Sequence, residues 1–139
     1  MKSTALIERS AAASTEKLTI NLGVVDLGRI DLLVDEGFYS NRTDLIRTAI
    51  RNQLALHGEA VKSTVARRTL ELGLQSFSRA DLERVRASRR MLQIHVVGLV
   101  RIADDVTADL ARATIASVEV LGAFHASSKV REALRDRIR

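Results

Sequence analysis

The stretch EKLTINLG, residues 16–23, alternates between apolar and polar side chains in the way that a β-strand does. The residues that would lie on one side of an extended chain are Leu18, Ile20 and Leu22. The residues on the opposite side are Lys17, Thr19 and Asn21. No second strand-like run follows before residue 69, yet an isolated strand cannot satisfy its own backbone groups. The first question is therefore what this strand pairs with.

A short amphipathic helix is expected directly after the strand. Its apolar residues recur at helical spacing and form one stripe: Leu27, Ile30, Leu33 and Val34. Gly37 follows the acidic pair Asp35 and Glu36, where a left-handed residue commonly ends a helix.

The segment FYSNRTDLIRTAIRNQLALHG, residues 38–58, predicts a second helix. Asn41 suits the N-cap, and Asp44 stands three residues later, as the acid of a capping box does. We expect Gly58 to end the helix. Its buried stripe would be Leu45, Ile46, Ala49, Ile50 and Leu54.

A strand followed by two helices in so short a segment is too small to bury its apolar surface alone. The simplest solution is a symmetric dimer, in which two copies of residues 16–22 pair antiparallel and four helices cover the apolar face of the ribbon. The strand is thus predicted to pair with the same strand of a second chain.

The run KLTINL…LGRIDLLVDEGFYSNRTDLIRTAIRNQL resembles the ribbon-helix-helix (CopG/MetJ/Arc-type) family of transcriptional regulators. The resemblance covers residues 16–57. It implies that the dimeric ribbon enters the major groove of DNA and that the outward side chains read base edges. The residues in those positions are Lys17, Thr19 and Asn21. Their chemistry agrees, because Lys donates to guanine, Asn pairs in a bidentate manner with adenine, and Thr offers a hydroxyl and a methyl.

The same resemblance implies that the turn before the second helix holds the DNA backbone. A helix N-terminus presents free N–H groups and the positive end of the helix dipole, which suits a phosphate. The expected phosphate contacts are Ser40, Asn41 and Arg42. Such contacts position a protein on DNA without reading its sequence.

The formal net charge of +5 is unevenly distributed along the chain. Residues 1–58 carry equal numbers of basic and acidic residues, whereas residues 62–90 carry eight basic residues and three acidic ones. This excess suggests further phosphate contacts, although a solvated helix face explains it equally well. The proposed auxiliary DNA contacts are Arg67, Arg68, Arg84, Arg86, Arg89 and Arg90.

The second half contains a faint repeat of an apolar strand, a polar cap and a short helix. At a spacing of 24 residues, Val96 aligns with Val120 and Gly98 with Gly122, and a weaker copy places Leu72 on Val96. Ser78 and Asp81 form a candidate capping box. The expected strands, parallel and joined by right-handed crossovers, are 69–75, 92–102 and 117–125. Their edges would favour assembly beyond a dimer, and a compact monomeric lobe is an equal alternative.

The composition argues against several other classes of protein. The chain has no cysteine, which excludes disulfides and thiolate metal ligands. One branch of the family responds to nickel, but the three histidines of this chain, at positions 57, 95 and 125, are far apart in the sequence and do not suggest a metal site. No phosphate-binding loop or nucleophile elbow indicates an enzyme or a cofactor. No run is long and apolar enough to span a membrane. The opening residues lack a hydrophobic signal core and include Glu8, so we expect a cytoplasmic protein, associated with the nucleoid through its DNA binding.

The sequence therefore predicts an α+β protein that is not an enzyme and binds no metal or cofactor. It would consist of a disordered tail (1–15), a dimeric ribbon-helix-helix domain (16–57), a linker or helical connection (58–68) and a βα-repeat domain for oligomerisation or effector response (69–139). The expected function is sequence-specific DNA binding, acting more simply as a repressor than as an activator. An antitoxin that binds a toxin, and a polymerising scaffold anchored on DNA, are the alternatives.

Overall fold

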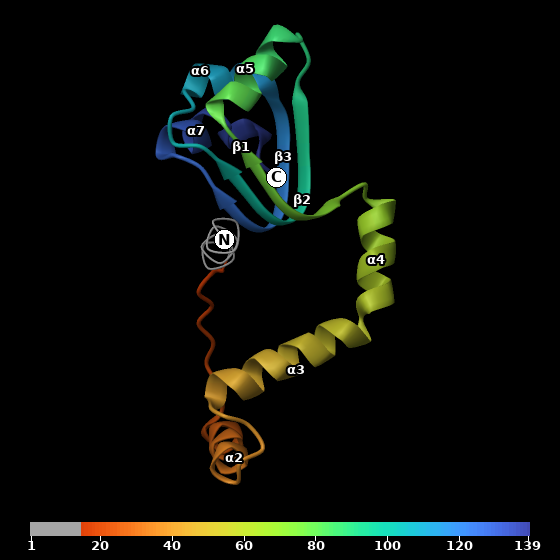
Figure 1. Ribbon diagram of the computed structural model, residues 1–139, viewed down its shortest axis with the longest axis vertical. Helices are drawn as coiled ribbons and strands as arrows, with labels where there is room; N and C mark the ends of the chain where they lie inside the picture. The colour runs from red at the N-terminus through yellow and green to blue at the C-terminus, as the bar shows by residue number, and fades with distance from the viewer. Residues whose placement is uncertain (1–14) are drawn as a thin grey trace, which may run out of the picture. The chain divides into compact units, whose positions relative to one another are not determined.

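The computed structural model describes residues 15–139, which form two compact units. One consists of residues 17–64, and the other contains residues 15–16 together with 65–139. The boundary falls within the connection expected at residues 58–68, which is helical: α4 spans Gly58–Arg67. The chain is mixed α+β, as the sequence predicted, and its sheet has three parallel strands (Figure 1).

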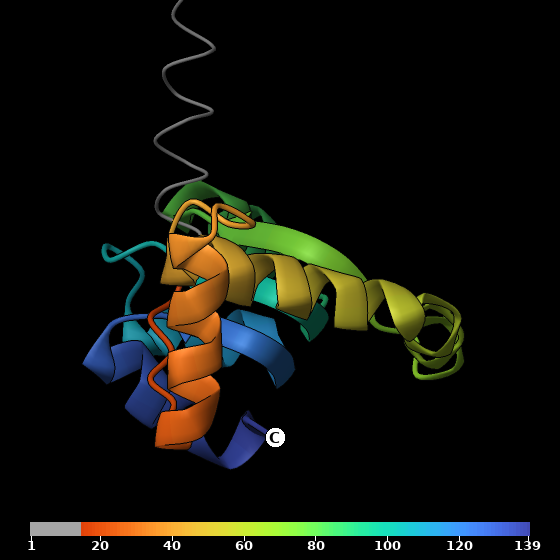
Figure 2. The same cartoon turned by 90° about the horizontal axis from the view of Figure 1, so that it is seen from below.

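The first unit begins with an extended segment followed by two helices, α2 (Val24–Asp35) and α3 (Arg42–Leu56). These helices cross steeply at the turn that joins them (Figures 1 and 2). Residues 15–23 belong to no helix or strand, so the strand expected at 16–22 is unpaired within the described part of the chain. A strand is defined by its hydrogen-bonded neighbour, and no strand of this unit is available to it.

The end of α2 confirms the role predicted for Gly37. This residue has a φ of 86°, and its N–H donates to the carbonyl of Val34 over 3.1 Å. The N–H of Phe38 donates to the carbonyl of Leu33 over 3.0 Å, which completes a Schellman motif. Glycine is needed here because a side chain strains the left-handed conformation.

The ends of α3 agree in part with the sequence analysis. The side chain of Asn41 accepts a hydrogen bond from the N–H of Asp44 over 2.8 Å, as an N-cap does. The carboxylate of Asp44 accepts from Ser40 instead of from the cap residue, which is a variation on the predicted box. The expectation that Gly58 ends the helix was wrong, because His57 is the C-cap and Gly58 begins α4.

The first unit has almost no interior of its own. No residue of α2, α3 or α4 is buried. The strongly exposed apolar side chains of this unit include Leu18, Val24, Val25, Leu32, Phe38, Leu54 and Leu56. Burial of apolar surface is the main driving force for folding, so these residues need a cover that their own chain does not supply.

The second unit contains the sheet, with strands β1 (Glu71–Phe77), β2 (Leu92–Ile102) and β3 (Ile115–His125) in the order β1-β2-β3. All three predicted strands are present and parallel; β1 is displaced by two residues and β3 begins two residues early. The helices between and after the strands are α5 (Arg79–Ala87), α6 (Ala108–Thr114) and α7 (Ser128–Ala133), followed by a 3₁₀ turn, η1 (Arg135–Arg137).

Each of these helices begins with an N-cap residue whose hydroxyl accepts a hydrogen bond from a backbone N–H. The caps are Ser78, Thr107 and Ser127. At Ser78 the capping box predicted with Asp81 is complete, since each side chain bonds the other's backbone N–H. The bond from the Ser78 backbone to the carboxylate is the largest of the causes that lower the pKa of Asp81.

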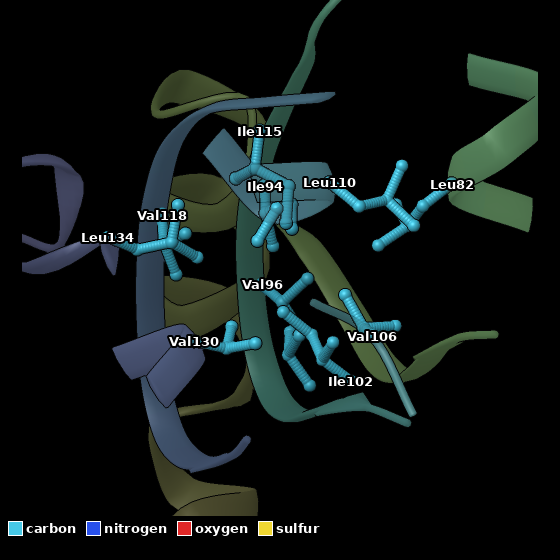
Figure 3. Close-up of a cluster of buried hydrophobic side chains, with 12 residues drawn as sticks. Leu82, Ile94, Val96, Ile102, Val106, Leu110, Ile115, Val118, Val130 and Leu134 are labelled. Carbon is cyan, nitrogen blue, oxygen red and sulfur yellow. The ribbon is translucent and has the colours of Figure 1, made fainter. Parts of the chain in front are cut away.

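The core lies between one face of the sheet and the three helices. Ile94, Val96 and Val118 on the strands meet Leu82, Leu110 and Val130 on α5, α6 and α7, and all are almost completely buried (Figure 3). The buried residues of this cluster are all aliphatic, in keeping with an aromatic content of only 3%. The second unit therefore has the interior that the first lacks.

The sequence repeat corresponds to the register of β2 against β3. Val96 is paired with Val120, and Gly98 with Gly122, as the alignment at 24 residues predicts. The alignment of the first copy was wrong by one residue, because Leu72 is opposite Val97 and not Val96. In the observed register Gly73 is opposite Gly98, so three glycines form one row across the sheet.

This row of glycines has a steric cause. All three residues have φ between 128° and 142°, which side chains rarely adopt. A Cβ at Gly98 would lie 2.0 Å from the carbonyl oxygen of Gly73, and one at Gly122 would lie 2.1 Å from that of Gly98. The strands can be bonded in this register only if both positions lack a side chain.

We predict that Gly98→Ala unfolds or severely destabilises the sheet unit, whereas Gly73→Ala is less damaging. Both substitutions strain a positive φ, but a Cβ at Gly73 meets no atom within 4 Å. The difference between the two variants therefore isolates the collision with the neighbouring carbonyl. Thermal unfolding followed by circular dichroism measures it, and equal melting temperatures would contradict this account.

Candidate nucleic-acid interface

The side chains expected to read DNA bases are all exposed. They are Lys17, Thr19 and Asn21. The apolar residues that alternate with them are exposed too: Leu18 by 79%, Ile20 by 56% and Leu22 by 43%. In a single chain neither face of this segment is packed against other residues. Its apolar face is therefore available to a partner.

The turn between α2 and α3 is rigidly bonded around the residues expected to contact phosphate. The side-chain oxygen of Asn41 is occupied by the cap bond, and the Ser40 N–H donates to Asp44 over 3.0 Å. No hydrogen bond within residues 15–139 uses the Ser40 hydroxyl or the Asn41 side-chain NH₂. The turn can therefore present both donors to an anion without losing its cap.

Arg42 has a partner that the sequence did not indicate. Its guanidinium donates to both carboxylate oxygens of Asp31 on α2, over 2.7 Å and 2.8 Å. These hydrogen bonds lower the pKa of Asp31 and raise the pKa of Arg42. Both side chains remain about half exposed, at 55% for Arg42 and 48% for Asp31. The pair joins the two helices and orients the arginine at the N-terminus of α3, while the carboxylate offsets part of its charge.

The auxiliary arginines divide into two groups. Arg84 is paired with Asp81, and Arg68 is paired with Glu119 on β3. Arg67, Arg86, Arg89 and Arg90 form no ion pair within residues 15–139 and are exposed. Arg86 lies at the end of α5, and Arg89 and Arg90 follow just after it. They are therefore the arginines with the most charge to offer a polyanion.

The histidines are distributed over different elements. His57 contacts Gln53 on the same helix, His95 lies 3.5 Å from Glu119, and His125 is bonded to Glu16. Among residues 15–139 no group of three or more histidine, aspartate or glutamate side chains is placed to hold a metal ion. Within the same range, no helix has the length and apolar character needed to cross a membrane.

Comparison with family models decides the class of the protein. The model of the ribbon-helix-helix transcriptional regulator family matches residues 13–131. The chain belongs to this family. Its members are DNA-binding transcriptional regulators, typically dimers. No curated protein and no solved structure gives a significant match.

The extent of the match changes one conclusion drawn from the sequence. The resemblance seen in the sequence covered residues 16–57 only. The family match continues through β1, β2 and β3 into α7. The parallel sheet is therefore a part of this family's pattern and not an addition peculiar to this chain.

We predict that Thr19→Ala or Asn21→Ala weakens discrimination at the contacted base by about 1–3 kcal/mol. Both side chains are exposed, so the melting temperature should hardly change. Asn52→Ala is the matched control, because Asn52 is an exposed asparagine within α3. Competition binding with operator and scrambled duplexes tests this, and undiminished discrimination in the double variant would refute the assignment.

Replacing Arg86, Arg89 and Arg90 by Gln should flatten the dependence of DNA affinity on salt. Each phosphate contact adds about 0.9 to the slope of log affinity against log salt, so the slope should fall by roughly two to three per contacting chain. Arg84→Gln is the control, because this arginine is already paired with Asp81. A salt titration on operator and random duplexes measures both slopes. An unchanged slope in the triple variant would mean that the cluster is merely a solvated surface.

Proposed function

We propose that this chain is a sequence-specific DNA-binding repressor that acts as a dimer through residues 16–57. The observation that carries the proposal is the absence of any buried residue in α2, α3 and α4, combined with an exposed apolar face at residues 18, 20 and 22. A symmetric partner covers both surfaces at once. Two copies of residues 16–22 then form an antiparallel ribbon, which supplies the missing backbone bonds.

The polar side of that ribbon is the base-reading surface. When the apolar residues turn toward the helices, alternation places Lys17, Thr19 and Asn21 on the opposite side. A two-stranded ribbon fits the major groove, where each base pair presents a distinct pattern of donors and acceptors. The dimer thus offers two sets of readers, related by its two-fold axis.

The turn before α3 supports the ribbon by contacting the DNA backbone. Ser40, Asn41 and Arg42 lie at the N-terminus of a 15-residue helix, where the backbone is partially positive. Arg42 can share its guanidinium between Asp31 and a phosphate, because half of this side chain is exposed. These contacts fix the register from which the ribbon reads the bases.

A reporter experiment tests the proposed regulation. The operator is first selected from random duplexes with the purified chain and is then placed over a promoter. The wild-type chain should lower expression, because a dimer bound there blocks the polymerase. The variant that combines Thr19→Ala and Asn21→Ala should remain dimeric by light scattering but fail to repress, whereas Asn52→Ala should repress normally. Increased expression with the wild-type chain would contradict repression, and a monomeric wild-type chain would contradict the dimer.

A further inference from the structure

A cavity of about 400 Å³ lies at the carboxyl ends of β2 and β3 and is formed entirely by the sheet unit. Ligands of open sheets with parallel strands commonly bind just outside the carboxyl ends of the strands. The apolar part of the lining consists of Ile102, Ala103 and Ala126. Small-molecule sites usually have volumes of about 300–1,000 Å³, so this cavity has room for a small organic molecule.

Three basic side chains reach this cavity from different elements. Arg101 and His125 are partners in the register of β2 and β3, whose backbones lie about 4.8 Å apart. Arg131 comes from α7, where its guanidinium lies 5.4 Å from the centroid of the Phe124 ring and donates to the Phe124 carbonyl. These contacts hold the third basic group beside the end of β3. The cavity therefore presents two permanently charged guanidinium groups and an imidazole to whatever enters it.

One of these basic groups already binds a carboxylate. A ring N–H of His125 donates to Glu16, which belongs to the sheet unit and directly precedes Lys17. The side chains of His125 and Glu16 are 40% and 57% exposed. An exposed pair of this kind contributes little to stability, so a carboxylate from solution can take the place of Glu16.

We propose that this cavity binds a small organic carboxylate that also carries a hydroxyl or an amino group, and that the ligand displaces Glu16 from His125. Guanidinium groups suit a carboxylate because their donors match its two oxygens. Asp104 also lines the cavity, where it repels a second anionic group but accepts a hydrogen bond from a hydroxyl or an ammonium. The apolar lining accommodates the carbon chain of the ligand.

Displacement of Glu16 has a consequence for regulation, which rests on the function proposed above. The bond to His125 anchors the residue that precedes the ribbon segment. An anchored segment has less conformational freedom to lose when it pairs and meets DNA. Release of the anchor by the ligand therefore lowers the affinity for the operator. By linkage, the operator lowers the affinity for the ligand by the same factor.

Calorimetric titration of the full-length chain at constant ionic strength tests the ligand class. The probes are L-malate, L-aspartate and succinate, because the first two differ from succinate only by a hydroxyl or an amino group. We expect saturable binding of malate or aspartate and at least tenfold weaker binding of succinate, and the tighter of the first two shows which donor the site prefers. Binding of neither would refute the site. Equal affinity for succinate would refute the ligand class.

Substitutions of the basic and acidic lining residues test the geometry. Arg131→Gln should weaken ligand binding at least tenfold, since a charge-assisted hydrogen bond is lost. Arg135→Gln is the matched control, because Arg135 is an exposed arginine in η1. Asp104→Asn, an exposed substitution, should narrow the preference for malate or aspartate over succinate by removing the repulsion. Full affinity in Arg131→Gln, or an unchanged preference in Asp104→Asn, would overturn the proposed contacts.

Glu16→Gln tests the displacement. An amide competes less well for His125 than a carboxylate, so the ligand should bind about two- to fivefold more tightly. Glu59→Gln, an exposed substitution in the first turn of α4, is the matched control and should leave the affinity unchanged. Weaker or unchanged binding in Glu16→Gln would refute the competition.

Operator binding, measured with and without saturating ligand, separates this inference from the proposed function. The ligand should weaken operator binding of the wild-type chain severalfold, whereas Glu16→Gln should bind more weakly from the start and not respond. An operator affinity that the ligand does not alter would refute the role of the anchor. A chain that binds the operator but no ligand would refute only the carboxylate site. A chain that binds the ligand but selects no operator would refute only the proposed function.

Discussion

The apolar side chains of residues 17–64 cannot be buried by their own chain, and this constraint governs the rest of the structure. Two amphipathic helices and one extended segment offer apolar surfaces that all require a cover, yet no residue of α2, α3 or α4 is buried. Helix caps and the Schellman motif at Gly37 stabilise local shape, but each contributes little compared with a hydrophobic core. The polar face of the segment can be presented to DNA only when the opposite face is buried. In the function proposed above, dimerisation and DNA reading are thus consequences of one physical requirement.

The sheet unit meets the same requirement in a different way. Its crossover helices cover one face, and a cluster of aliphatic residues from Leu82 to Leu134 is buried there. The parallel strands depend on the glycine row, because a side chain at Gly98 or Gly122 would collide with the neighbouring strand's carbonyl. The register of the sheet therefore has a steric cause.

The surplus of positive charge and the proposed base-reading residues lie in different segments of the chain. Residues 1–58 carry equal numbers of basic and acidic side chains, and Arg42 is bonded to Asp31. The surplus of positive charge lies instead in residues 62–90, where Arg86, Arg89 and Arg90 have no carboxylate partner within residues 15–139. Long-range attraction to a polyanion depends on net charge, whereas base recognition depends on the geometry of donors and acceptors. Because the surplus charge and the proposed base-reading residues lie in different segments, a substitution that changes the attraction to DNA need not alter base recognition.

The sequence by itself determined the elements that near neighbours control: α2 and its end at Gly37, the caps at Asn41 and Ser78, and three parallel strands with the β2–β3 register. It also indicated that residues 16–57 need a second chain, because an unpaired strand and an unfilled stripe are visible in the pattern. Only the tertiary structure decided the pairing of Arg42 with Asp31, the one-residue shift that brings Gly73 opposite Gly98, and the exposure of Leu72 and Leu121. The division has a physical reason. Caps and periodicity arise from atoms a few residues apart, whereas a register, an ion pair between helices and a covered face arise from contacts between segments that only folding brings together.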